Sequence, residues 1–122
     1  MAQILIVEDN PFFRQALKRM LLTRFPFLEI SEAADGKEAF RKIEKAIPQL
    51  IFMDIGLPGE DGIHLTRRIR KFHPRISIVI ISNYDTSEYR ERAFEAGATS
   101  FLSKRSSLPS DIFDTVELSF PA

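Results

Sequence analysis

Three carboxylates in this sequence each stand directly after an apolar run of the kind that forms a buried strand. Glu8 and Asp9 follow Ile4–Val7, and Asp54 follows Leu50–Met53. Carboxylates that lie close together raise each other's pKa unless a cation neutralises them. An all-oxygen site with few protein ligands suits Mg²⁺, which keeps several waters and leaves positions for phosphate oxygens. If the two runs are neighbours in one sheet, these residues predict a magnesium site.

Two further polar residues end later strand-like runs. Ser82 follows Ser77–Ile81, and Lys104 follows Ser100–Ser103. A hydroxyl donor and a fixed ammonium are what a bound phosphoryl group needs on its remaining sides. Considered alone, Ser82 would be interpreted as a turn hydroxyl and Lys104 as a solvated surface group. Each acidic residue would be interpreted as a helix cap or a turn residue. It is their joint arrangement that favours phosphoryl chemistry.

The segments between these runs have helical period and cap signals. Cap signals begin three helices, at Asn10 with Pro11, at Asp35 with Glu38, and at Asp85 with Glu88. Apolar spacing marks two more, through Leu65, Ile69 and Phe72 and over Ser110–Leu118. Strict alternation of strands and helices predicts a parallel sheet with helices on both faces.

The composition of the strands predicts their order in the sheet. Ile4–Val7, Leu50–Met53 and Ile78–Ile81 are continuously apolar, as in strands buried on both faces. Leu28–Glu32 and Ser100–Ser103 alternate with polar residues and are expected at the edges. The fold class is therefore α/β, a flavodoxin-like (βα)5 three-layer sandwich with a five-stranded parallel sheet of order 2-1-3-4-5. In that order the ligand crevice lies between the first and third strands, where the three carboxylates emerge.

Composition limits the classes of function. The 17 Lys and Arg residues balance 17 Asp and Glu residues, so the basic excess of a nucleic-acid-binding domain is absent. Without cysteine, the chain has no disulfide and no thiolate metal site. Its apolar runs are shorter than the roughly 18 residues of a membrane span, and acidic residues cut short the first of them. We expect one cytoplasmic domain over residues 1–122, with no contact to nucleic acid or membrane.

From Ile4 to at least Lys104 the chain resembles the receiver domain of bacterial response regulators in two-component systems. The family pattern is carried by several residues and motifs in order: the pair Glu8-Asp9, Asp54 in Phe-Met-Asp-Ile-Gly-Leu-Pro, Gly59, Asp61, Gly62, Ser82, and Gly97-Ala98-Thr99-Ser100-Phe101-Leu102-Ser103-Lys104. One departure is Arg105, which stands where the family commonly has proline. This variant resembles regulators whose output is a helix-turn-helix domain.

The resemblance implies a role for each matched residue. Asp54 would accept a phosphoryl group and, with Glu8, Asp9 and the backbone carbonyl of Gly56, would hold Mg²⁺. Lys104 would bind the phosphoryl oxygens, and Ser82 and Phe101 would act as the switch, the ring swinging inward after phosphorylation. Such a domain is a signalling switch rather than an enzyme, although it catalyses its own phosphoryl transfer and slow autodephosphorylation.

The resemblance also implies the partners. The phosphodonor would be a sensor histidine kinase or a phosphotransfer protein of a phosphorelay, and a homodimer on phosphorylation is left open. These donors approach along the first helix, where Phe12 stands off the apolar stripe. Its ring is either partly buried at the domain edge or a docking contact. Most of the other phenylalanines are expected in the core, including Phe13, Phe40 and Phe52.

Two alternative functions are weighed against the switch. An aspartate-nucleophile phosphohydrolase generally has a second aspartate two residues after the nucleophile, where this chain has Gly56. A pseudo-receiver, which signals by protein contacts alone, usually lacks the acidic pair, the aspartate or the lysine, whereas all are present here. Both alternatives are disfavoured. Gly56 and Tyr84 flank the site and are expected to influence hydrolysis of the phosphoryl group.

Overall fold

The computed structural model describes residues 2–120, over which strands and helices alternate. The strands are β1 (Gln3–Val7), β2 (Glu29–Ala33), β3 (Leu50–Met53), β4 (Ser77–Ser82) and β5 (Ser100–Ser103). The helices are α1 (Pro11–Arg24), α2 (Gly36–Lys45), α3 (Gly62–Phe72), α4 (Ser87–Glu95) and α5 (Pro109–Ser119). The predicted strands are all present, and none of their ends differs from the prediction by more than one residue.

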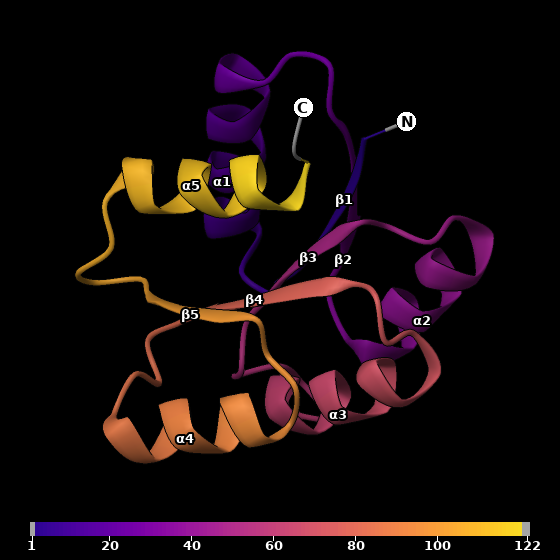
Figure 1. The fold of residues 1–122 in the computed structure, drawn as a ribbon, viewed down its shortest axis with the longest axis vertical. Coiled ribbons are helices and arrows are strands. Elements are labelled where there is room, and N and C mark those ends of the chain that lie inside the picture. Colours follow the sequence, from indigo (N-terminus) through magenta and orange to yellow (C-terminus); the bar gives the residue numbers. More distant parts are fainter. Residues whose placement is uncertain (1, 121–122) are drawn as a thin grey trace.

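The strands form one parallel sheet of order β2-β1-β3-β4-β5, as predicted. Figure 1 shows α1 and α5 over one face of this sheet and α2, α3 and α4 over the other. This is the predicted three-layer sandwich. Within the described residues, no helix has the length and apolar character needed to cross a membrane.

Strand periodicity divides the core into two clusters, one on each face of the sheet. In β1, Ile4 and Ile6 pack with α1 and α5, whereas Leu5 and Val7 pack with the helices of the opposite face. All four residues of β3 are buried, which is why its sequence is continuously apolar. The buried central strands fix the register of the sheet and so the positions of the residues that follow them.

The predicted helix starts are correct at two positions and wrong at one. Asn10 Oδ1 accepts the N–H groups of Phe12 and Phe13 at the start of α1, and Asp35 caps α2. The predicted cap Asp85 does not begin α4. Thr86 does so instead, because the carboxylate of Asp85 accepts a hydrogen bond from the hydroxyl of Ser103.

The phenylalanines divide between core and surface. Phe52 is buried, while Phe13 and Phe40 are partly buried against the core, in line with the prediction. Phe72, expected on the apolar face of α3, is 65% exposed because the helix ends there and projects past the sheet. Helical spacing alone therefore overestimates burial at the helix end.

The start of α3 packs tightly against the end of β3. A Cβ atom built on Gly62 would lie 1.9 Å from the carbonyl oxygen of Asp54, a distance that no side chain tolerates. The N–H of Gly62 donates to the carbonyl of Ile55 at 2.8 Å, which closes the loop. Gly62 is thus required for the close approach that holds the loop after Asp54 in place.

Candidate functional site

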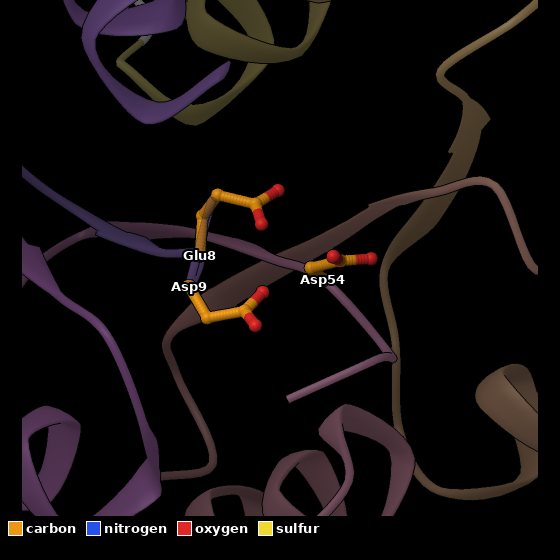
Figure 2. A group of neighbouring side chains, drawn as sticks. All are labelled: Glu8, Asp9 and Asp54. Atoms are coloured by element: carbon orange, nitrogen blue, oxygen red, sulfur yellow. The ribbon is translucent and has the colours of Figure 1, made fainter. Parts of the chain in front are cut away.

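The three carboxylates meet where β1 and β3 end side by side. Val7 pairs with Met53 in the sheet, and the N–H of Asp54 donates to the carbonyl of Val7 at 3.0 Å. Glu8 and Asp54 are therefore neighbours across adjacent strands. One oxygen from each of Glu8, Asp9 and Asp54 lies within 4.8 Å of the others, and Figure 2 shows the three side chains grouped at this edge.

Asp54 is buried beside the exposed Asp9. Glu8 is 2% exposed and Asp54 7% exposed, whereas Asp9 is exposed. One oxygen of Asp54, Oδ1, accepts the N–H of Ile55 at 2.8 Å, and the other, Oδ2, accepts from Lys104 Nζ at 3.2 Å. The carboxylate is thus held in a defined orientation with an exposed anion beside it.

Lys104 reaches the site from the end of β5. Its N–H donates to the carbonyl of Ser82 at 3.0 Å, which fixes the start of the β5–α5 loop. The Nζ atom lies 2.6 Å from Glu8 Oε1 and 3.2 Å from Asp54 Oδ2. It also lies 4.2 Å from the centroid of the Phe13 ring. The lysine therefore links the acidic pair to the predicted phosphoacceptor.

Burial and the contacts among the charged groups shift the pKa values in this cluster. Burial raises the pKa of Glu8, and the charge of Asp54 adds to the effect, although contacts from Lys104 and the N–H of Asn10 oppose it. Burial on its own would lower the pKa of Lys104, but the contacts with Glu8 and Asp54 outweigh this and raise it. The repulsion between neighbouring carboxylates can be reduced in two ways: one of them binds a proton, or the group binds a cation.

The residues present fit a divalent cation with oxygen ligands. Three carboxylates converge, and the two buried ones, Glu8 and Asp54, share the ammonium of Lys104. Buried carboxylates are costly unless cations neutralise them, and one ammonium cannot neutralise two. The donor set is the kind that Mg²⁺ prefers. The predicted fourth ligand, the carbonyl of Gly56, stays a prediction.

The two predicted switch residues lie on the neighbouring strands β4 and β5. Ser82 is fully buried, and its Oγ accepts the N–H of Tyr84 at 3.2 Å. Phe101 is 6% exposed and belongs to the core cluster, with the guanidinium carbon of Arg90 4.7 Å from its ring centroid. The ring of Phe101 is therefore already buried in this structure, and its inward movement on phosphorylation stays a prediction.

Gly56 and Tyr84 lie against each other beside the site, as expected of flanking residues. A Cβ atom built on Gly56 would lie 2.7 Å from Cε2 of the Tyr84 ring. A larger residue at position 56 would therefore have to displace the tyrosine.

Phe12 lies in α1, a few residues after the acidic pair, and its ring is 85% exposed, so the partial burial considered for it is wrong.

Two residues to which sequence reasoning gave no role at the site make contacts around it. Arg14 donates from Nη1 to the carbonyl of Glu8 at 2.8 Å and from Nε to Glu32 Oε1 at 2.9 Å. Arg105 donates its N–H to Ser103 Oγ, and its guanidinium lies 3.6 Å from Asp85 Oδ1. No local pattern marks these residues, because their ion pairs, with Glu32 and Asp85, join residues that are distant in the sequence.

Comparisons with known proteins agree with this geometry. A family model described as the response regulator receiver domain matches residues 4–117. Transcriptional activator protein ExaE of Pseudomonas putida is 36% identical over 101 residues, which are 83% of this chain and 47% of that protein. The chain spans about half the length of the curated relatives it matches.

Two solved structures show the same fold over nearly the whole chain. A LuxR-family response regulator from Aurantimonas sp. SI85-9A1 has a TM-score of 0.87 and 36% identity, and the match covers 97% of this chain and 84% of that one. The receiver domain of sensor histidine kinase PA1611 from Pseudomonas aeruginosa PAO1, solved with magnesium in its active-site cleft, has a TM-score of 0.83 and 29% identity, with coverages of 96% and 95%. The chain therefore belongs to the response regulator receiver domain family of two-component signalling.

Proposed function

We propose that this domain is a phosphorylation-activated switch that accepts a phosphoryl group on Asp54. The observation that carries the proposal is the position of the Asp54 carboxylate, between the ammonium of Lys104 and the acidic pair Glu8 and Asp9. A nucleophilic oxygen, a fixed cation and a metal-binding pair are the parts that phosphoryl transfer to a carboxylate needs.

Mg²⁺ would be held by Glu8, Asp9, Asp54 and the backbone carbonyl of Gly56. When bound, the metal neutralises negative charge on the oxygens of the transferring phosphoryl group. The convergence of three carboxylates, of which the buried Glu8 and Asp54 share the ammonium of Lys104, supports this assignment. So does the magnesium ion in the active-site cleft of the PA1611 receiver domain, a relative of the same fold.

The reaction that we propose is an in-line displacement at phosphorus. An oxygen of the Asp54 carboxylate forms a bond to the phosphorus of a phosphohistidine, and the P–N bond breaks with its electron pair left on the imidazole. The ammonium of Lys104 moves toward the phosphoryl oxygens and balances their charge. The N–H of Ile55, which bonds one oxygen of Asp54, keeps the carboxylate oriented for attack.

The proposed donor is a sensor histidine kinase or a phosphotransfer protein. The exposed ring of Phe12, beside the acidic pair on α1, offers an apolar contact to such a protein. Exposed aromatic side chains near a polar site are common anchors of protein interfaces. We assign the domain to the cytoplasm, in line with the family, and expect it to make no contact with nucleic acid.

Phosphorylation would be read out through Ser82 and Phe101. The hydroxyl of Ser82 can exchange its bond with the Tyr84 N–H for one to a phosphoryl oxygen. Ser82 is the last residue of β4. The strand beside β4 in the sheet, β5, carries Phe101, whose ring is buried. A shift of Ser82 therefore acts on the surface formed by α4, β5 and α5.

The test is the intact mass of the protein after incubation with Mg²⁺ and acetyl phosphate, beside the variant Asp54→Ala. We expect a gain of one phosphoryl group that depends on the metal and is absent in the variant. A folded native domain that binds Mg²⁺ and gains no mass, with this donor or with a phosphohistidine protein, would contradict the proposal and favour a pseudo-receiver.

A further inference from the structure

The ring of Phe13 lies directly beside the ammonium group of Lys104. The distance from Nζ to the ring centroid is 4.2 Å, well within the range of a cation–π interaction. Phe13 is in the first turn of α1, and its N–H donates to the cap Asn10 at 3.3 Å. The same loop carries Glu8 and Asp9, so the ring has a fixed position relative to the acidic pair.

The ammonium of Lys104 is largely shielded from water, so water could not readily take the place of the aromatic ring. Its side chain is only 12% exposed, and its ammonium lies among Glu8, Asp54 and the ring. The electron-rich face of an aromatic ring attracts a cation more strongly when the cation is desolvated. The interaction is therefore expected to be at the stronger end of its range.

The contact of Lys104 with the Phe13 ring differs from its contacts with the two carboxylates, because only the carboxylates take part in the proposed reaction. Glu8 and Asp54 are taken up by the metal and the phosphoryl group in the proposed function, so their contacts with Lys104 must change. Phe13 cannot bind a metal or a phosphoryl group and remains available as a partner throughout. Its attraction is also weakly directional, which lets the ammonium move toward the phosphoryl oxygens without losing the contact.

A cavity beside the lysine makes such a hold necessary. A space of about 220 Å³ lies between α1 and the β5–α5 segment, lined by Phe13, Met20 and Ile112 among other apolar residues and by Lys104 itself. The stem of the lysine therefore has room to swing away from Asp54. Because Phe13 lines this space and its ring contacts the ammonium, loss of that contact is a cost that opposes the movement.

We propose that Phe13 is a positioning residue for phosphoryl transfer, whose ring face keeps the ammonium of Lys104 directed at Asp54. This inference rests on the proposed function, since it assigns a further residue to that reaction. It predicts that the electron density of the ring, and not only its size, sets the rate of phosphoryl uptake.

The first experiment compares Phe13→Leu and Phe13→Tyr with the native chain, using the initial rate of mass gain from acetyl phosphate at saturating Mg²⁺. We expect Leu to slow the reaction by about three- to tenfold and Tyr to retain most of the rate, because only Tyr keeps an aromatic face. Met20→Leu is the matched control, since Met20 lines the same cavity but has no aromatic ring to offer the ammonium. It should leave the rate unchanged.

The second experiment separates charge from shape by placing increasingly fluorinated phenylalanine analogues at position 13. Fluorine withdraws electrons from the ring face but changes its size little, so the rate should fall with each step while the unfolding midpoint stays constant. Equal rates across the fluorinated series, or a Phe13→Leu rate equal to that of the native chain, would overturn the inference alone. A native chain that gains no phosphoryl group would overturn the proposed function and this inference together.

Discussion

At the scale of single residues, the site is organised around how negative charge is balanced. Glu8 and Asp54 are buried and share the ammonium of Lys104, whereas Asp9 is exposed and has no ion-pair partner among the described residues. The ion pairs of this cluster therefore involve its buried carboxylates. The role proposed for the exposed Asp9 is metal binding, which needs no ion pair within the protein.

This difference predicts the effect of Asp9→Asn. The substitution removes one metal-binding charge and breaks no ion pair, so it should weaken Mg²⁺ binding by at least about tenfold. The free energy of unfolding without metal should not fall. Calorimetric titration with Mg²⁺ and urea unfolding of the metal-free protein measure the two quantities. Unchanged affinity would remove Asp9 from the metal site.

The exposure of Phe12 predicts a defect that depends on the donor. Phe12→Ala should slow phosphoryl transfer from a phosphohistidine protein by about tenfold, as expected when an interface anchor is lost. Transfer from acetyl phosphate should keep its native rate, because the ring is 85% exposed and so is not packed among the buried carboxylates. Equal slowing with both donors would instead assign the ring to the chemistry.

At the scale of elements, ion pairs between α1 and β2 hold the loop that carries the acidic pair. Glu32, on the edge strand β2, accepts from Arg14 at 2.9 Å and from Lys18 at 3.0 Å. Arg14 also binds the carbonyl of Glu8. The helix, the edge strand and the site loop are thus joined through one guanidinium.

Glu32→Gln tests this connection through the pH dependence of stability. Burial alone would raise the pKa of Glu32, but the bonds from Lys18 and Arg14 outweigh it and lower the pKa below its ordinary value of 4.5. The contribution of the carboxylate is therefore present above that value and is lost as the pH falls through the lowered pKa. The variant should unfold more easily at neutral pH, by about 1 kcal/mol.

Urea unfolding of both proteins between neutral and acidic pH measures this difference. It should shrink once the pH falls below 4.5, because the native carboxylate then becomes protonated. A difference that stays constant over the whole pH range would show that the charge of Glu32 has no part in holding the loop.

Sequence reasoning was accurate for these elements where the signals are local. Continuous apolar runs identified β1, β3 and β4, and alternating composition placed β2 and β5 at the edges. Because parallel strands end at the same edge of the sheet, the order also brought Glu8, Asp9, Asp54 and Lys104 together. Their meeting could therefore be predicted from pattern and topology.

The sequence was silent where distant side chains compete. Asp85 has the spacing of a helix cap, but its carboxylate accepts a hydrogen bond from the hydroxyl of Ser103, 18 residues further on. Thr86 caps α4 instead. The contacts of Arg14 with β2 and of Phe13 with Lys104 likewise cross between elements. Such contacts depend on the packed fold and leave no periodic trace in the sequence.

At the scale of the whole molecule, the site depends on how closely the helical layer meets the sheet. The start of α3 lies against the end of β3, where the absence of a side chain at Gly62 permits contact with the carbonyl of Asp54. Asp54, the proposed phosphoacceptor, is therefore part of the interface between two layers. A substitution that disturbs this packing should also lower the rate of the proposed phosphoryl transfer to Asp54.

Gly62→Ala should lower the free energy of unfolding by about 3 kcal/mol, because the added Cβ meets rigid backbone. Gly59→Ala is the matched control in the same loop. Its Cβ would meet no atom within 4 Å, so it should cost only the strain of its φ of +78°, about 1 kcal/mol. Urea unfolding measures both, and equal losses would contradict the packing described for α3.

The central claim is that Asp54 itself carries the phosphoryl group. Borohydride reduces an aspartyl phosphate to homoserine, so reduction after incubation with Mg²⁺ and acetyl phosphate, followed by peptide sequencing, identifies the modified residue. The account predicts homoserine at position 54 and at no other aspartate. Homoserine at Asp9 or elsewhere, or a phosphorylated peptide without reducible aspartate, would contradict it.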